Sequence, residues 1–166
     1  MMSFVREATP GDRARLRECH VAAVREFGPR AYADRQVAAW ADEVDPAEDY
    51  PVDADGHYLV VAERPTGDES EGEVVGYGHL APTESEVRAV YVHPDAAGRG
   101  VGTAILDALE ARARDLRLDA LALSASLNAV GFYERASYER VGRDTYTTVH
   151  DGETVDLDVV QMQKRL

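Results

Sequence analysis

The sequence predicts a single domain of the mixed α/β class. Short apolar runs typical of strands alternate with stretches whose apolar residues recur at helical spacing. Near residue 100, a strand-like run passes through a glycine-rich turn into a helical pattern, and the chain ends in two strand-like runs around Asp151-Gly152. A length of 166 residues suffices for one domain with a sizeable core but not for two ordinary ones, so we expect residues 1–166 to form one unit.

The first half of the chain is predicted to form a strand, two helices and three further strands. Thr9, Pro10 and Asp12 mark the start of the first helix as a cap, a first-turn proline and a first-turn acid. Gly28 and Pro29 end that helix. The expected ranges are strands at 3–8, 57–64, 73–81 and 86–92, helices at 9–27 and 34–43, an acidic loop at 45–56, and a polar turn at 65–72 where disorder is expected.

A long helix is expected after the glycine-rich turn. Its apolar residues Ile105, Leu109, Ala113 and Leu116 recur on one side at helical spacing. The expected ranges after it are a buried strand at 118–124, a short helix at 129–135, and hairpin strands at 138–149 and 154–163.

Composition argues against several classes of function. The chain carries 31 acidic and 18 basic residues, a net charge of −13, which argues against a nucleic-acid partner. No apolar run approaches the ~20 residues of a membrane span. The N-terminus lacks the apolar core of a signal peptide, so we expect a cytoplasmic protein with no membrane partner. Cys19 is the only cysteine, which excludes an internal disulfide.

The charged residues are unusual in kind as well as in number. Lys164 is the only lysine, and the other basic residues are arginines. This acidic, lysine-poor composition resembles the surface of proteins from salt-loving archaea, whose self-repulsion is screened by high salt. The alternative is an acidic protein that works at ordinary salt.

The glycine-rich turn at 97–102 predicts an anion site. Glycines let the backbone approach a ligand closely, and the first N–H groups of the following helix point at negative charge. A nucleotide P-loop needs Lys after its last glycine, but Thr103 and Ala104 follow Gly102. A dinucleotide fingerprint needs a further glycine at position 103. A pyrophosphate loop for coenzyme A is the third interpretation, and it is the one favoured.

Two segments resemble a known family, the GCN5-related N-acetyltransferases (GNATs). The run AGRGVG at 97–102 resembles the family's Gln/Arg-x-x-Gly-x-Gly/Ala motif, and NAVGFYERASY at 128–138 resembles its N-x-x-A-x-x-F-Y-E-x-x-G-F segment. Ala97 departs from the usual Gln or Arg, and Ser137 departs from the usual Gly. The donor missing at position 97 is expected to weaken coenzyme A binding by about 1–2 kcal/mol. Arg99 is a candidate for partial replacement of that donor.

The resemblance implies a mixed sheet flanked by helices, in the order β-α-α-β-β-β-α-β-α-β-β, with the acyl-CoA tail in a splay between the fourth and fifth strands. It implies acetyl-CoA as cosubstrate and no metal. The histidines and Cys19 likewise show no metal-ligand spacing. Asn128 has an alternative role as the N-cap of the short helix. The residues implied for cofactor binding are Val90, Val92, Gly98, Arg99, Gly100, Val101, Gly102, Thr103 and Asn128.

The same resemblance implies the catalytic residues. Tyr133 matches the tyrosine that protonates the leaving thiolate, and Glu86 is the best candidate for a general base. Each has a structural alternative: Tyr133 as a packed partner of Phe132, and Glu86 as an ordinary solvated acid. His79 and His93 are alternative bases, although His93 more simply shapes the turn before the glycine loop.

The implied reaction moves an acetyl group from acetyl-CoA to a primary amine by direct attack in a ternary complex. The acceptor is expected to be a small-molecule amine or a protein amino group, held between the first two helices and the terminal hairpin. A non-catalytic module that binds or senses acyl-CoA is the alternative. Dimers are common in the resembled family, and the sequence leaves a homodimer open. The residues of interest on the acceptor side are Arg25, Arg30, Tyr32, Trp40 and Tyr146.

Overall fold

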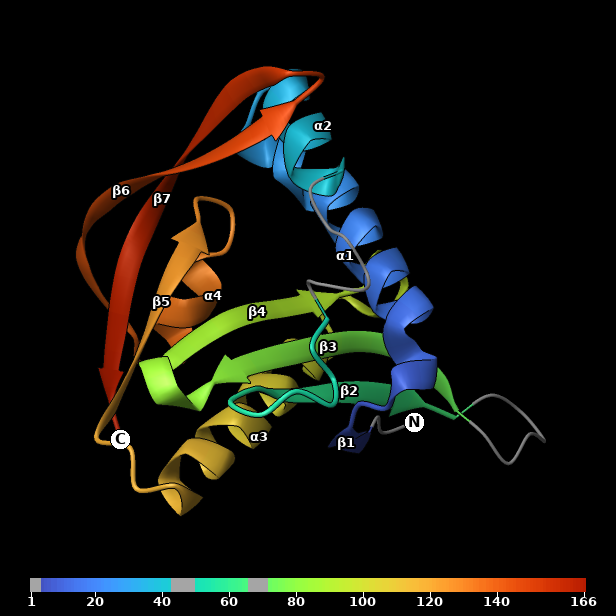
Figure 1. Cartoon of the computed structure of the whole chain (residues 1–166), viewed down its shortest axis with the longest axis vertical. Coiled ribbons are helices and arrows are strands. Elements are labelled where there is room, and N and C mark those ends of the chain that lie inside the picture. The colour runs from blue at the N-terminus through green and yellow to red at the C-terminus, as the bar shows by residue number, and fades with distance from the viewer. Residues whose placement is uncertain (1–3, 43–49, 66–71) are drawn as a thin grey trace.

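Seven strands form one mixed sheet in the order β1-β2-β3-β4-β5-β7-β6 (Figure 1). The structure, a computed structural model, describes residues 4–42, 50–65 and 72–166. Neighbouring strands are antiparallel except β4 and β5. The predicted class and element order are confirmed, whereas much of the acidic loop at 45–56 and of the polar turn at 65–72 lies outside the described residues. The elements are β1 (Phe4–Glu7), α1 (Arg13–Phe27), α2 (Asp34–Asp42), β2 (Tyr58–Arg64), β3 (Glu73–Ala81), β4 (Glu86–Val92), α3 (Val101–Asp115), β5 (Ala120–Ser126), α4 (Val130–Arg135), β6 (Glu139–His150) and β7 (Glu153–Arg165).

The parallel strands β4 and β5 part soon after they meet. Glu86 pairs with Ala122, beside a 2.9 Å bond from the Ala122 N–H to the Ser85 carbonyl, and no other residue pair joins these strands in the described chain. Figure 1 shows the two strands running in different directions from this point. The expected splay between the fourth and fifth strands is therefore confirmed. It leaves the edge of β4 that faces β5 without a strand partner over residues 87–92.

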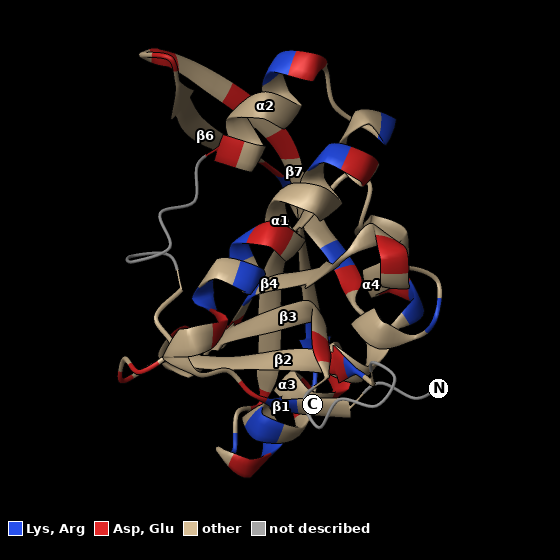
Figure 2. Ribbon diagram, turned by 90° about the vertical axis from the view of Figure 1, so that its right-hand side faces the viewer, with Lys and Arg blue, Asp and Glu red and all other residues tan. Residues whose placement is uncertain are grey.

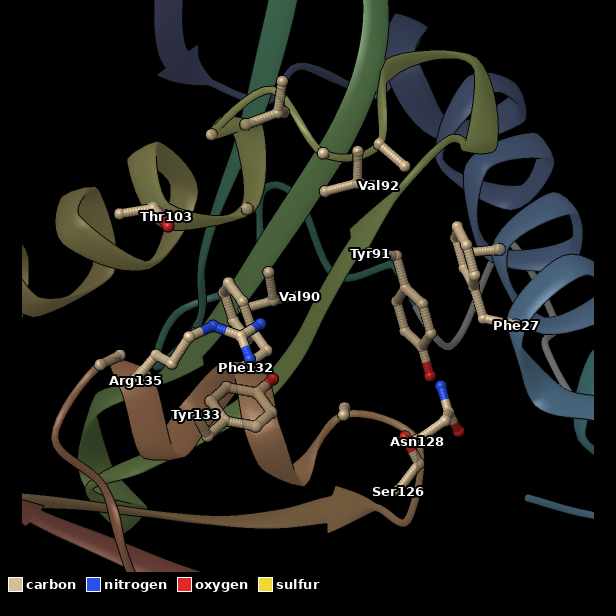
Figure 3. A pocket seen from close by; sticks show the side chains of 18 of the residues that line it. Phe27, Val90, Tyr91, Val92, Thr103, Ser126, Asn128, Phe132, Tyr133 and Arg135 are labelled. Atoms are coloured by element: carbon tan, nitrogen blue, oxygen red, sulfur yellow. The ribbon is translucent and has the colours of Figure 1, made fainter. Parts of the chain in front are cut away.

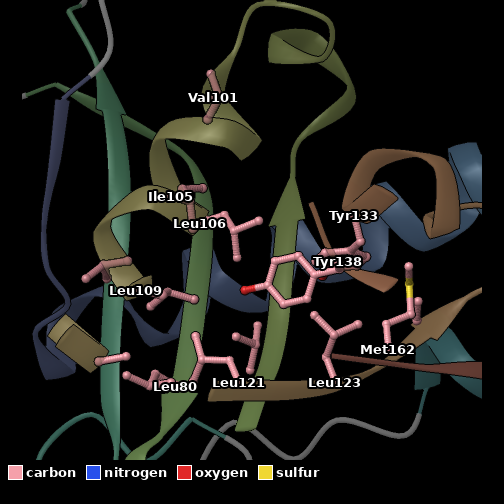
Figure 4. Close-up of a cluster of buried hydrophobic side chains, with 14 of the residues drawn as sticks. Leu80, Val101, Ile105, Leu106, Leu109, Leu121, Leu123, Tyr133, Tyr138 and Met162 are labelled. Carbon is pink, nitrogen blue, oxygen red and sulfur yellow. The ribbon is translucent and has the colours of Figure 1, made fainter. Parts of the chain in front are cut away.

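Helices cover both faces of the sheet. α3 packs on one face through Ile105, Leu106 and Leu109, which are at most 1% exposed (Figure 4). A Cβ at Gly78 of β3 would lie 2.4 Å from Cγ2 of Ile105, so glycine is needed for this close approach. α1 covers the other face, where the fully buried Leu16 belongs to a second core cluster.

The terminal hairpin is fixed at its turn and by contacts with α2. Asp151 and Gly152 have φ values of 52° and 78°, as expected for a two-residue Asp-Gly turn. Near this turn, Gln36 Nε2 donates to a β7 carbonyl at 2.8 Å, and Arg35 forms an ion pair with Glu153. The hairpin therefore reaches across from the sheet to α2, as Figure 1 shows.

Several predicted boundaries differ from those observed. The first helix begins with a 3₁₀ turn at Pro10–Asp12, and β5 begins at Ala120 rather than at 118. Leu116 was expected on the apolar side of the long helix, which is wrong: α3 ends at Asp115 and Leu116 is 41% exposed. Arg117 adopts a left-handed conformation with φ of 61°, which turns the chain away from the helix at this point.

Acidic and basic side chains are interspersed over the helices and the hairpin (Figure 2). The acidic excess is thus spread over the molecule rather than confined to one element. None of the helices in the described part has the length and apolarity needed to cross a membrane.

Candidate active site

Two cavities meet at the opening between β4 and β5. The larger, of about 700 Å³, is lined by most of the glycine loop at 97–103, and we name it the loop cavity. The smaller, of about 450 Å³, is lined by many ring side chains, and we name it the aromatic cavity. Because they share lining residues, the two cavities adjoin each other. The shared residues are Trp40, Val90, Tyr91, Ser126, Ala129 and Tyr133.

The glycine loop presents backbone to the loop cavity. Gly98 and Gly100 have φ values of 74° and 81°, which glycine adopts without strain, and a Cβ at either would meet no atom within 4 Å. A Cβ at Gly102 would lie 3.1 Å from Cε1 of Phe132, so this glycine lets α3 approach α4. The loop leads into the N-terminus of α3, whose first N–H groups lack partners within the helix. Such an open, donor-rich turn suits an anion.

The structure places all but one of the expected cofactor residues around the loop cavity. Arg99 is the exception, because it is exposed and lines neither cavity. Asn128 is not the N-cap of α4, which is Ala129. Its Oδ1 is buried and has no hydrogen-bond partner within the described chain, so a ligand N–H could satisfy it. The residues that line the cavity are Val90, Val92, Gly98, Gly100, Val101, Gly102, Thr103 and Asn128.

Three cations line the loop cavity, although Ala97 contributes no donor. Lys164 Nζ lies 2.8 Å from a carboxylate oxygen of the buried Glu110, and the Arg30 guanidinium lies 4.9 Å from the centre of a phenyl ring. The third, Arg135, makes no hydrogen bond or ion pair with the part of the chain that the structure describes. Figure 3 shows its side chain lying along α4 in the cavity. Arg135 is therefore the cation best able to meet an incoming phosphate.

Tyr133 lines both cavities, and Figure 3 shows its ring beside Phe132 in the loop cavity. Its ring is 7% exposed and packs edge-on against Phe132 and Tyr138, with ring centres 5.0 and 5.7 Å apart. Burial raises the pKa of the Tyr133 phenol well above its ordinary value, so the hydroxyl stays protonated. The Tyr133 ring therefore packs against its neighbours, as the structural alternative predicts. This packing leaves the Tyr133 hydroxyl able to donate a proton where the two cavities adjoin.

Glu86 lies at the closed end of the splay and lines the aromatic cavity. Its side chain is 42% exposed, and a carboxylate oxygen lies 3.6 Å from Nε of Arg88. Arg88 also forms an ion pair with Glu84. The structure thus places Glu86 in the wall of the aromatic cavity while leaving it partly solvated.

A histidine pair, of which His79 is buried and His57 is half-buried, also lines the aromatic cavity. Nε2 of His79 lies 2.9 Å from Nδ1 of His57. Burial lowers the pKa of His79 to about 4, with contributions from His57 and Arg88, so this imidazole is neutral near pH 7. His93 instead shapes its turn as expected, since its Nδ1 accepts a hydrogen bond from the Asp95 N–H at 3.2 Å.

The acceptor-side candidates divide between the two cavities. Tyr32, Trp40 and Tyr146 line the aromatic cavity, Arg30 lines the loop cavity, and Arg25 lines neither. The Tyr32 hydroxyl donates to a β7 carbonyl at 2.6 Å and accepts from the Leu127 N–H at 3.0 Å. Tyr32 is therefore a bridge between chain segments that lie far apart in the sequence.

Comparison with known proteins decides the family. The sequence model described as "Acetyltransferase (GNAT) family" matches residues 20–138, well over half of the chain. The chain belongs to the GNAT family. The resemblance carried by the two motifs is thereby confirmed.

Individual relatives agree with the GNAT assignment. A structure from Rhodopseudomonas palustris, described as a GCN5-related N-acetyltransferase ("Aminotransferase, Class-II"), is 30% identical, covers 100% of this chain and 97% of its own, and has a TM-score of 0.85. The ribosomal-protein-alanine N-acetyltransferase of Brucella melitensis is 25% identical with a TM-score of 0.68, covering 98% of this chain and 99% of its own. Mycothiol acetyltransferase of Amycolatopsis mediterranei (strain U-32) is 41% identical over 75 residues, which are 43% of this chain and 23% of that protein. The chain thus matches under a quarter of that relative's length.

The site of this GNAT protein fits coenzyme A in three separate features. The open glycine turn suits a pyrophosphate, Arg135 offers a cation, and the unsatisfied Asn128 oxygen suits an amide N–H. No group of His, Cys, Asp and Glu suited to a metal ion occurs among the described residues.

Sequence reasoning missed several ring residues on the acceptor side of this GNAT fold, as well as Arg135. Tyr77 and Tyr91 lie opposite each other on β3 and β4. Because alternate residues of a strand lie on the same face of the sheet, the sequence pattern could have assigned each of these rings to a face. Tyr50 and His57 lie outside the helices and strands, so no periodic pattern could indicate that they line the cavity.

Proposed function

We propose that the chain is an acetyl-CoA-dependent N-acetyltransferase acting on a primary amine, with direct attack in a ternary complex. The wall that the loop cavity and the aromatic cavity share, which includes Tyr133, carries this proposal, because it gives donor and acceptor separate but adjoining sites. The same fold in a phosphinothricin acetyltransferase from Sinorhizobium meliloti was solved in complex with AcCoA, which supports the cosubstrate.

The loop cavity would hold the cosubstrate through this chain's own groups. Backbone N–H groups of residues 98–102 and the Thr103 hydroxyl would bind the pyrophosphate, with Arg135 as a nearby cation. The unpaired edge of β4 at Val90 and Val92, together with Asn128, would bind the pantetheine arm. When bound, acetyl-CoA supplies a thioester carbonyl that accepts the amine and a thiolate that leaves.

Two residues would move the protons. Glu86 takes a proton from the amine, directly or through water, as the C–N bond forms. Tyr133 gives its phenolic proton to the sulfur as the C–S bond breaks, and it regains a proton from solvent. The proton lost by the amine thus balances the one gained by the free thiol.

Calorimetric titration of acetyl-CoA in molar KCl, with NADH and ATP as controls, tests the first half of this proposal. Saturable binding of acetyl-CoA alone is expected, followed by amine-dependent release of free thiol. Binding without thiol release for any amine would favour the alternative, a non-catalytic acyl-CoA-binding module. The absence of binding would overturn both functions and leave Ala97 as the mark of a lost site.

A further inference from the structure

The hairpin encloses the aromatic cavity at the wide end of the splay. The Tyr32 hydroxyl binds the Asp158 carbonyl of β7 at 2.6 Å, and Nδ1 of His150 lies 3.6 Å from an oxygen of Asp42 in α2. Leu157 is 3% exposed and lines the cavity. These contacts, visible as the meeting of β6, β7 and α2 in Figure 1, place the hairpin at one end of the aromatic cavity. The cavity volume of about 450 Å³ suits a compact acceptor.

Ring side chains form a continuous wall of this cavity. The ring centres are 6.3 Å apart for Trp40 and Tyr91, 5.6 Å for Tyr91 and Tyr77, and 5.7 Å for Tyr77 and Tyr50. The indole N–H of Trp40 donates to the Tyr91 hydroxyl at 3.2 Å, which fixes these two rings relative to each other. Tyr146, 44% exposed, adds a ring from β6. Walls of this kind favour a flat ring over an aliphatic body of similar size.

The charges of the cavity argue against a carboxylate on the acceptor. Among the described residues, Arg88 is the only Lys or Arg that lines it, and Arg88 already pairs with Glu84 and Glu86. A carboxylate entering here would meet Glu86 and a cation that two acidic side chains already engage. The buried His79 supplies no compensating charge, since it is neutral near pH 7. An amine is favoured instead, because Glu86 attracts its protonated form.

We infer that the acceptor is a small arylalkylamine without a carboxylate group, whose ring packs on the wall formed by Trp40, Tyr91 and Tyr146. This inference rests on the proposed acetyltransferase function and names the substrate class of that same site.

Four acceptors test the inference: 2-phenylethylamine, 2-cyclohexylethylamine, L-phenylalanine and a hexapeptide with N-terminal Phe. The second removes the π-system, the third adds a carboxylate, and the fourth adds a chain. We expect kcat/KM, measured by thiol release, to be highest for 2-phenylethylamine by about tenfold or more. Preference for the cyclohexyl amine, the amino acid or the peptide would overturn the acceptor class while leaving acetyl transfer established. Acetyl-CoA binding with no transfer to any amine would overturn the enzyme proposal and this inference together.

Substitutions of the exposed Tyr146 test whether its ring contributes to acceptor binding, and this exposed position is chosen to preserve folding. Tyr146→Leu is expected to raise KM for 2-phenylethylamine about threefold to tenfold, with KM for acetyl-CoA unchanged. Tyr146→Phe should restore the wild-type value because it keeps the ring. Val149→Ala is the matched control, since Val149 is 67% exposed on the same strand and lines neither cavity. Equal KM values for Tyr146→Leu and wild type would remove Tyr146 from the acceptor wall.

Discussion

Tyr133 is one of the residues that line both cavities, and its raised pKa keeps its proton at physiological pH. Tyr133→Phe keeps the packed ring and removes only the hydroxyl. We expect kcat to fall by about 10²-fold or more, while acetyl-CoA affinity and Tm stay at their wild-type values. Thiol release, calorimetry and thermal melting check these three quantities. Wild-type turnover in the variant would show that the phenol is not the acid.

Arg135 and Arg99 allow a direct comparison of two cations near the glycine loop. Arg135 lines the loop cavity without a partner in the described chain, whereas Arg99 lines neither cavity. Arg135→Gln should therefore weaken coenzyme A binding about tenfold, the loss of roughly one charge-assisted hydrogen bond, and Arg99→Gln should change it much less. Calorimetry at low salt measures both. A larger loss for Arg99→Gln would instead support the prediction that Arg99 replaces the donor missing at position 97.

His79 predicts an acid limit to stability. Its folded pKa of about 4 lies below its ordinary value of 6.5. Between these values the unfolded imidazole binds a proton that the folded one does not, so the free energy of unfolding falls as pH falls. The loss approaches ~3 kcal/mol below pH 4. Urea unfolding at pH 7 and pH 5 should show this decrease, and His79→Gln should show a smaller one. An equal pH dependence in the variant would assign the effect to other groups.

At the scale of elements, the sequence predicted those boundaries of helices and strands that depend on the local backbone. Thr9-Pro10, the Asp151-Gly152 turn and the glycine loop each mark a boundary through residues that restrict or free the backbone. The splay followed from the family resemblance rather than from periodicity. The bonds between the hairpin and α2 were not predictable from local patterns, because Gln36 and Asp156 are 120 positions apart in the sequence. Arg135 was missed for a similar reason, since its role depends on how α4 lies against α3.

The contact between α3 and β3 depends on a missing side chain. A Cβ at Gly78 would lie 2.4 Å from Cγ2 of Ile105 and 3.0 Å from Cδ1 of Leu109, so Gly78→Ala must displace the helix. We expect a loss of about 1–3 kcal/mol in the free energy of unfolding, measured by urea denaturation. Gly142→Ala is the control, because a Cβ there meets no atom within 4 Å. Equal stability of the two variants would contradict the close packing.

At the scale of the whole molecule, the net charge of −13 sets the response to salt. Acidic residues occur on several helices and strands (Figure 2), so their repulsion acts over distances that salt can screen. The screening length is ~10 Å at 0.1 M and ~3 Å at 1 M salt. Tm should therefore rise by several degrees between 0.1 M and 2 M KCl, as measured by differential scanning calorimetry.

A charge-reduced variant separates screening from other effects of concentrated salt. Glu26, Asp119 and Glu139 are exposed and form no ion pair with other described residues, so their replacement by Gln, Asn and Gln removes repulsion and few contacts. The triple variant should melt higher than wild type at 0.1 M KCl and gain less from added salt, because it has less repulsion left to screen. A wild-type Tm that does not respond to KCl would refute the expected dependence on salt. A rise of equal size in both proteins would attribute the effect to preferential exclusion of salt from the surface rather than to charge.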